Sequence, residues 1–437
     1  MKKLIIIILS LGFVTGIQAQ ENVYPAPAQK GLLFITHATI HVGNGTVIND
    51  GTIKVMDGKI QEVGTNIAVP SGDVKVYDVK GKHVYPGLIQ ASSSLGLVEV
   101  SSIRATSDVN EIGEMNPNIR SIVAYNTDSK VTNTLRNNGI LLSNVVPGGS
   151  LITGSSSVVQ LDAWNWEDAA YVMDNGIHFQ MPSLLARRGG RGGGFGGFGQ
   201  QPAGDPVQRA LDQIESVKAF FREAKAYLAE PKHAEVNLKY EAVKGLFEKK
   251  QKLFVHCDIV KQMLIALDFS KEFGFQIVIV GGSDSWQIAD LLKANNVPVI
   301  LNQMHSLPTL IDDDVDQPYK TPALLQKAGV LFAINDEDGQ FRGRNLAFNA
   351  GTAAAYGLSK EEALSAITLN VAKILGIEDR TGSIEKGKDA NIVVCEGDIL
   401  DMRSQLITDA FIQGRKVSMD DKQKQLFERY KYKYGVK

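Results

Sequence analysis

From residue 86 onward, short apolar segments alternate with longer stretches that have a helical pattern. The apolar segments show little alternation of polar and apolar residues, which is typical of strands buried on both faces of a sheet. Parallel strands of this kind are joined by helical crossovers. We therefore predict an α/β protein whose repeated units, over about 300 residues, form a (β/α)8 TIM-like barrel. We expect strands at 139–146, 253–257, 276–280, 298–302 and 330–335, and helices at 206–229, 260–273, 285–295 and 321–328.

Both ends of this region have a different pattern. Residues 31–84 read as short strands and turns, with a turn at 43–45. A helix is predicted to begin at Ser359, because Ser359 and Glu362 have the spacing of a capping box. The chain then returns to strands at 391–395, 410–413 and 416–418, and a charged helix is expected within 420–437. We expect a β unit on each side of the barrel.

The first residues have the layout of a secretory signal peptide. Lys2 and Lys3 precede an apolar run over 4–17, and Ala19 supplies a small residue before a polar switch. We predict cleavage after Ala19, a periplasmic or secreted protein, and no membrane anchor after cleavage, because the apolar run is too short to span a bilayer. Residues 187–204 are rich in Gly and Arg, and we interpret them as a mobile loop.

Charge and cysteine content narrow the range of partners. The chain has 46 Lys and Arg against 48 Asp and Glu, so it lacks the cationic excess of a nucleic-acid binder. A small-molecule ligand is expected instead, together with a homo-oligomer or a protein partner. Cys257 and Cys395 are too few for a thiolate metal cluster, and we expect both to be buried and unpaired.

Three motifs in order along the chain resemble those of the amidohydrolase superfamily, notably its imidazolonepropionase-like members. They read GKHVYPGLI at 81–89, TLNVAKILG at 368–376 and GSIEKGKDANIVV at 382–394. The resemblance implies a hydrolase barrel (86–380) that uses a divalent metal such as zinc. It also implies a small composite β-sandwich built from an N-terminal part (20–85) and a C-terminal part (381–419), followed by the helix in 420–437.

The first strand departs from the family pattern at its metal ligands. In active members, Pro-Gly-Leu-Ile is followed by Asp-x-His-x-His, whose imidazoles hold the metal. This sequence has Gln90, Ser92 and Ser94 at those three positions. A neutral hydroxyl is a poor zinc ligand beside imidazole or carboxylate. We therefore expect no metal at the family's usual site.

The other site positions are only partly retained. The resemblance places the fifth-strand histidine at His256, puts Gly281 at the sixth-strand histidine, and aligns Glu337, beside Asp336, with the eighth-strand aspartate. These two acids are candidate catalytic groups, although acidic residues in a row favour a solvated turn. His305 follows a barrel strand and is expected near the mouth of the pocket. The predicted pocket consists of Ser92, Ser94, His256, His305 and Gly281.

Three functions are compatible with this pattern. One is an active hydrolase of non-peptide carbon–nitrogen bonds in cyclic amides or related small molecules, with an atypical metal site at His256 and Glu337. Another is a catalytically degenerate protein that needs no cofactor and binds a small molecule or pairs with an active paralogue. A metal-free hydrolase would use Ser92 or Ser94 with His256, but has no evident third group. We favour the degenerate protein.

Overall fold

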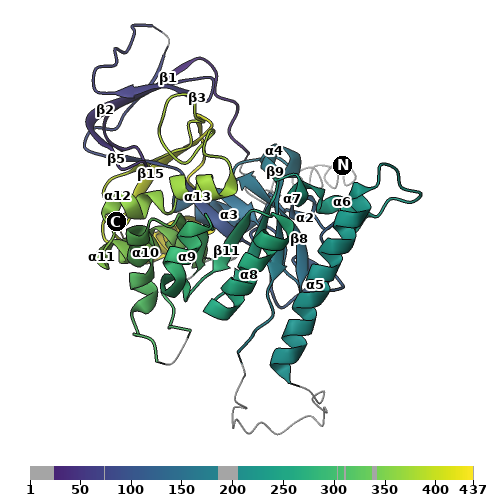
Figure 1. Cartoon of the computed structure of the whole chain (residues 1–437). Helices are drawn as coiled ribbons and strands as arrows, with labels where there is room; N and C mark the ends of the chain where they lie inside the picture. Colours follow the sequence, from purple (N-terminus) through teal and green to yellow (C-terminus); the bar gives the residue numbers. More distant parts are fainter. Residues whose placement is uncertain are drawn as a thin grey trace, which may run out of the picture.

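The computed structural model describes residues 24–72, 74–185, 205–302, 304–309, 312–336 and 342–436. The predicted signal peptide and the Gly-rich segment 187–204 lie outside these residues. Within them the chain forms two eight-stranded sheets. Figure 1 shows one sheet at the upper left and the other surrounded by helices below it. None of the helices in these ranges is both long and apolar enough to cross a membrane.

The first sheet joins the two ends of the chain, as the composite sandwich requires. Strand β5 (His83–Pro86) pairs antiparallel with β14 (Ile392–Cys395), which continues through β15 and β16. On its other side β5 pairs with β1, and β2 and β3 follow. The remaining bounds are β1 (Leu32–His41), β2 (Val47–Met56), β3 (Lys59–Gly64), β4 (Lys75–Asp78), β15 (Ile407–Ile412) and β16 (Arg415–Lys416).

The second sheet is the predicted barrel. Its strands follow one another in chain order from β6 to β13, and one face of several strands forms a buried apolar cluster with α13. The opposite face packs against the surrounding helices. The strands are β6 (Leu88–Ser93), β7 (Ile140–Val145), β8 (Ile152–Gln160), β9 (Ala170–Gln180), β10 (Lys252–Cys257), β11 (Ile277–Gly281), β12 (Val299–Asn302) and β13 (Phe332–Asn335).

Helices cover most of the barrel at the predicted places. α5 and α8 have the expected bounds, whereas α10 begins four residues earlier than 321, at Gln317. Ser359 and Glu362 form the predicted capping box at the start of α12. The helices are α2 (Ser121–Ala124), α3 (Lys130–Asn137), α4 (Trp166–Ala169), α5 (Pro206–Ala229), α6 (Leu238–Ala242), α7 (Lys244–Phe247), α8 (Val260–Phe273), α9 (Ala289–Ala294), α10 (Gln317–Ala328), α11 (Leu346–Ala355), α12 (Lys360–Ser365), α13 (Leu369–Leu375) and α14 (Lys422–Tyr434), with 3-10 turns at Arg104–Thr106, Ser285–Ile288 and Arg342–Asn345.

One barrel strand, β8, runs against its neighbours. β8 pairs antiparallel with both β7 and β9, so these three strands form a meander instead of βα units. Its sequence contains three consecutive serines, whose hydroxyls bond to side-chain or backbone groups of β9. Because this strand is polar, it lacks the apolar pattern by which other barrel strands can be predicted.

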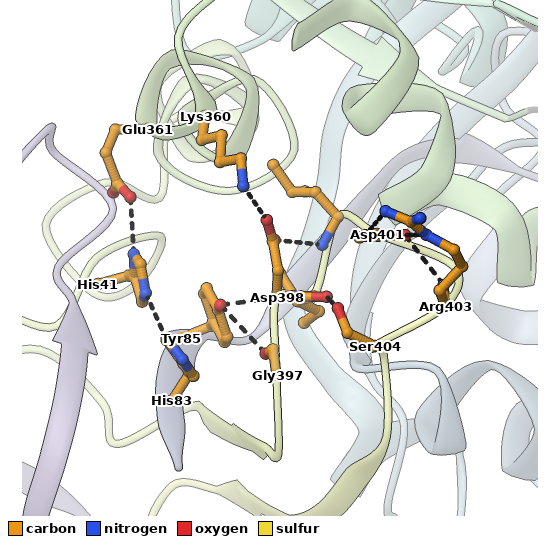
Figure 2. Close-up of polar contacts among 12 residues, drawn as sticks. His41, His83, Tyr85, Lys360, Glu361, Gly397, Asp398, Asp401, Arg403 and Ser404 are labelled. Carbon is orange, nitrogen blue, oxygen red and sulfur yellow. Dashed lines mark hydrogen bonds and ion pairs between the residues drawn. The ribbon is translucent and has the colours of Figure 1, made fainter. Parts of the chain in front are cut away.

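A polar junction holds the sandwich against the barrel (Figure 2). The Nδ1 atom of His41 lies 2.6 Å from a Glu361 oxygen at the start of α12, and its Nε2 lies 3.0 Å from Nδ1 of His83. Lys360 pairs with Asp398 at 2.7 Å. Burial, followed by the neighbouring His41, lowers the pKa of His83, which favours a neutral ring at pH 7.

A second junction is buried and ionic. The carboxylate of Asp162, after β8, accepts hydrogen bonds from Arg136 of α3 (3.1 Å) and Arg415 of β16 (3.0 Å). It also accepts from the backbone N–H of Ala26 at 2.9 Å. The Asp162 side chain is only 2% exposed. Three parts of the chain therefore meet at a single carboxylate.

Replacing Asp162 by asparagine should destabilise the fold strongly. The change keeps the shape but leaves two enclosed guanidinium groups without a counter-charge, which costs about 3–5 kcal/mol. Urea unfolding measures this loss. The matched control is Asp401→Asn, which breaks an exposed ion pair with Arg403 and should cost less than about 1 kcal/mol. A loss of similar size in both variants would contradict this account.

Candidate functional site at the barrel mouth

The strands at the two ends of the barrel sheet, β6 and β13, are joined by a side-chain amide. The Oδ1 atom of Asn335 accepts from the backbone N–H groups of Ala91 (2.9 Å) and Ser92 (3.2 Å). Its Nδ2 donates to the Ser92 carbonyl at 2.9 Å and to Oδ1 of Asn302 at 3.0 Å. Asn335 is fully buried. The side-chain amide of Asn335 thus forms hydrogen bonds to β6 like those that a backbone peptide group forms between paired strands.

Gln90 extends this neutral network. Its Nε2 donates to the backbone carbonyl of Asp336 at 2.8 Å, and its Oε1 accepts from the Ser143 hydroxyl at 3.3 Å. Ser92 is buried, and its hydroxyl has no hydrogen-bond partner among the described residues. Ser94 lies just past the end of β6 and is partly buried. The strand that carries the family's first metal ligands therefore presents amides and hydroxyls.

His256 lies on β10 beside a second histidine that the sequence analysis missed. Nδ1 of His178, on β9, is 2.9 Å from Nε2 of His256, and the His178 ring stacks on Phe254 at 4.8 Å between centroids. Nε2 of His178 is buried without a hydrogen-bond partner in the described part of the chain. The available sequence signal for His178 was a short strand-like pattern that contains one histidine and ends shortly before Pro182.

Both imidazoles are held in the neutral form. Burial lowers the pKa of His256 to about 4. Burial, then the adjacent His256, lowers the pKa of His178 well below its ordinary value. A pair of neutral rings joined by one hydrogen bond has a donor nitrogen facing an acceptor nitrogen. One ring nitrogen of His256 is therefore already engaged by protein.

The acidic residues after β13 are not all solvated. Asp336 is 3% exposed, and its carboxylate accepts hydrogen bonds from Arg342 (3.1 Å) and Asn349 (3.3 Å). The expectation of a solvated acidic turn is wrong for Asp336, because a guanidinium and an amide compensate its burial. Glu337 lies outside the described residues.

Gly281 leaves no room for the histidine that the family usually has there. Its backbone has φ +100°, and a Cβ added to it would lie 2.6 Å from a carboxylate oxygen of Asp258. Residues other than glycine rarely adopt this backbone conformation. The position is thus committed to a tight turn at the end of β11.

A small pocket opens beside Gly281, at the ends of β11 and β12. Its volume is about 30 Å³, room for one or two waters. Asp284 and Asp313 contribute carboxylates to its wall, and no Lys or Arg is among the described residues that line it. Burial, then the nearby Asp313, raises the pKa of Asp284. His305 lies between two residues of the lining, is exposed, and has its Nε2 2.6 Å from the Thr352 hydroxyl.

The described residues do not fit a catalytic divalent metal. Among them no three His, Cys, Asp or Glu side chains are grouped so as to hold one. The reason lies in the donor set: amides and hydroxyls are on β6, His256 is bonded to His178, and Asp336 is bonded to Arg342. Such groups are poor substitutes for the imidazoles and carboxylates that zinc prefers. Cys257 and Cys395 are buried and unpaired, as expected.

Comparisons with known proteins agree with this architecture. Residues 315–420 match the amidohydrolase family model. Amidohydrolase tasK of Hapsidospora irregularis is 22% identical over 80% of this chain, and the match spans 38% of that protein's length. An imidazolonepropionase of Thermoplasma volcanium is 35% identical over 86 residues, which are 19% of this chain and 21% of that protein. An amidohydrolase structure from Thermotoga maritima has a TM-score of 0.76 and 26% identity, covering 88% of this chain and 99% of that one.

The fold is therefore a hydrolase-type barrel with a composite β-sandwich, as predicted. The chain belongs to the amidohydrolase superfamily.

The two neutral imidazoles predict a loss of stability in mild acid. Unfolding returns His256 to a pKa of about 6.5, so the unfolded chain binds more protons below that pH. The contribution of His256 is complete above pH 6.5 and decreases as the pH falls toward 4. By pH 5 the loss is about 2 kcal/mol.

The free energy of unfolding at pH 7.5 and pH 5 measures this effect in wild type and in His256→Gln. The variant should have a shallower pH dependence. The control His305→Gln removes an exposed histidine and should keep the wild-type slope. A wild-type slope in His256→Gln would contradict the assignment.

Proposed function

We propose that this chain is an exported, catalytically degenerate member of the superfamily that binds a small molecule at the barrel mouth. The observation that carries the proposal is the Asn335 amide, which bonds to β6 where active members need open metal ligands. Gln90 and the Arg342–Asp336 ion pair support the proposal, because they engage polar groups at the barrel mouth in bonds within the protein. Export rests on the pattern of residues 1–19.

Unpartnered polar atoms support retained binding. The hydroxyl of Ser92, Oδ1 of Asn144 and Nε2 of His178 are buried without partners among the described residues. Such atoms are ordinarily satisfied by water or by a ligand. The pocket beside Gly281 has room for a single ammonium group, and Asp284 and Asp313 in its lining favour such a positively charged end of a ligand. Self-association or pairing with an active paralogue is part of the same proposal.

Purified protein should hold well under one equivalent of zinc, manganese or iron. The test is elemental analysis of the mature protein prepared without chelators, alongside a zinc-containing enzyme prepared in the same way. Stoichiometric metal that survives dialysis, together with turnover of a cyclic amide, would favour the active hydrolase with an atypical site. Metal without turnover would still contradict the proposed donor set.

Asp284→Asn should separate stability from binding. The raised pKa of Asp284 means that its charged form destabilises the folded state above that pKa. The variant should therefore melt at a higher temperature than wild type at pH 7.5, and the difference should shrink toward pH 4. Amine-bearing small molecules that raise the melting temperature of wild type should have less effect on the variant.

The control is Asp314→Asn, which removes a nearby carboxylate that is paired with Lys320 and absent from the pocket lining. It should leave the response to ligand unchanged. If no amine stabilises wild type while neutral or anionic compounds do, the proposed ligand class is wrong.

A further inference from the structure

Helix α14 has the sequence KQKQLFERYKYKY, and its hydrogen bonds to the rest of the described chain lie near its beginning. Asp421 caps the helix by accepting from the backbone N–H of Lys424 at 2.8 Å. Gln423 accepts from the Thr134 hydroxyl of α3 at 3.0 Å, and the Lys424 ammonium donates to the Met419 carbonyl at 2.6 Å. No residue of α14 is buried. The side chains beyond the first turn are therefore available to a partner.

Four apolar or aromatic side chains form a stripe along α14. Leu426, Tyr430 and Tyr434 are spaced by four residues, and Phe427 lies three before Tyr430, so all four share one face. Phe427, Tyr430 and Tyr434 are 64%, 51% and 68% exposed. Tyr432 is on the opposite side. An exposed contiguous stripe of this kind marks an interaction surface.

Cations border the stripe on both sides. Arg429 and Lys433 follow one edge, and Lys431 follows the other. The Lys433 ammonium lies 5.0 Å from the centre of the Tyr434 ring. With Lys422 and Lys424 included, the helix carries five cations and one acid, Glu428, so its net charge is +4. The whole chain has a net charge of −2, and the remaining residues therefore have a net charge of −6. Positive charge is concentrated on this helix.

We propose that α14 docks the protein on an anionic lipid surface. The stripe would lie at the boundary between headgroups and acyl chains, with the flanking cations on the lipid phosphates. An aromatic face bordered by Lys and Arg is the pattern of helices that lie in the membrane interface. Tyrosine suits this depth because its ring is apolar and its hydroxyl is polar. Pairing α14 with α14 of a second copy would instead bring rows of cations together.

The test is cosedimentation of the full chain with vesicles of phosphatidylcholine, with or without about 30% phosphatidylglycerol. Binding should require the anionic lipid and weaken at high salt. Arg429→Gln with Lys433→Gln should weaken binding about 30-fold, from roughly 5-fold per cation. Phe427→Ser, Tyr430→Ser and Tyr434→Ser together should weaken it at least about 10-fold.

Two control proteins match these variants. Tyr432→Ser removes a 92% exposed aromatic residue outside the stripe, and a double change of Lys261 and Lys386 to glutamine removes exposed cations elsewhere. Both should bind like wild type. Equal binding to neutral vesicles, or retained binding by the stripe variant, overturns the proposal. The proposal is also overturned if wild type binds no vesicles but forms a dimer in sedimentation equilibrium, and the stripe variant does not form that dimer. Because α14 buries no residue, circular dichroism of each variant should match wild type.

Discussion

The buried carboxylate of Asp162 holds together parts of the chain that are distant in sequence. It bonds to Arg136 from the barrel side, to Arg415 from the returning sandwich, and to the backbone of Ala26 near the start of the described chain. An enclosed charge tolerates the loss of a partner poorly, so these segments are fixed relative to one another. The composite sheet and the barrel can then act as one scaffold, with the contacts of α12 as a second attachment.

At the barrel mouth, polar side chains form hydrogen bonds and ion pairs with one another. Asn335 links β6 to β13, His178 bonds to His256, and Arg342 pairs with Asp336. A site that acts on a substrate needs groups whose bonding capacity remains open. Among the described residues, open capacity is found in a few buried atoms, and Asp284 and Asp313 line the pocket beside Gly281. The proposal of ligand binding without bond cleavage rests on this distribution.

The sequence predicted five of the eight barrel strands, β7 and β10 to β13, because burial on both faces leaves a readable apolar pattern. It predicted α5 and α8 to the residue, since each begins and ends at a clear boundary. It failed at β8, whose serines are satisfied by partners on β9 that only the fold brings close. For the same reason it missed His178 and took Asp336 for a solvated acid: both depend on neighbours from other strands or helices. Gly281 was recognised as a departure, but only the fold shows its positive φ and how near Asp258 lies to the place that a Cβ would take.

The meander of β7, β8 and β9 has a consequence for how the chain acquires its shape. Elsewhere in the barrel, neighbouring strands are joined by crossovers that contain helices, so pairing must close long loops. These three strands are close in sequence and can pair through short connections. The serine bonds also join β8 to β9. Local pairing is expected to precede distant pairing, so we expect the meander to form early and the flanking parallel strands to add to it.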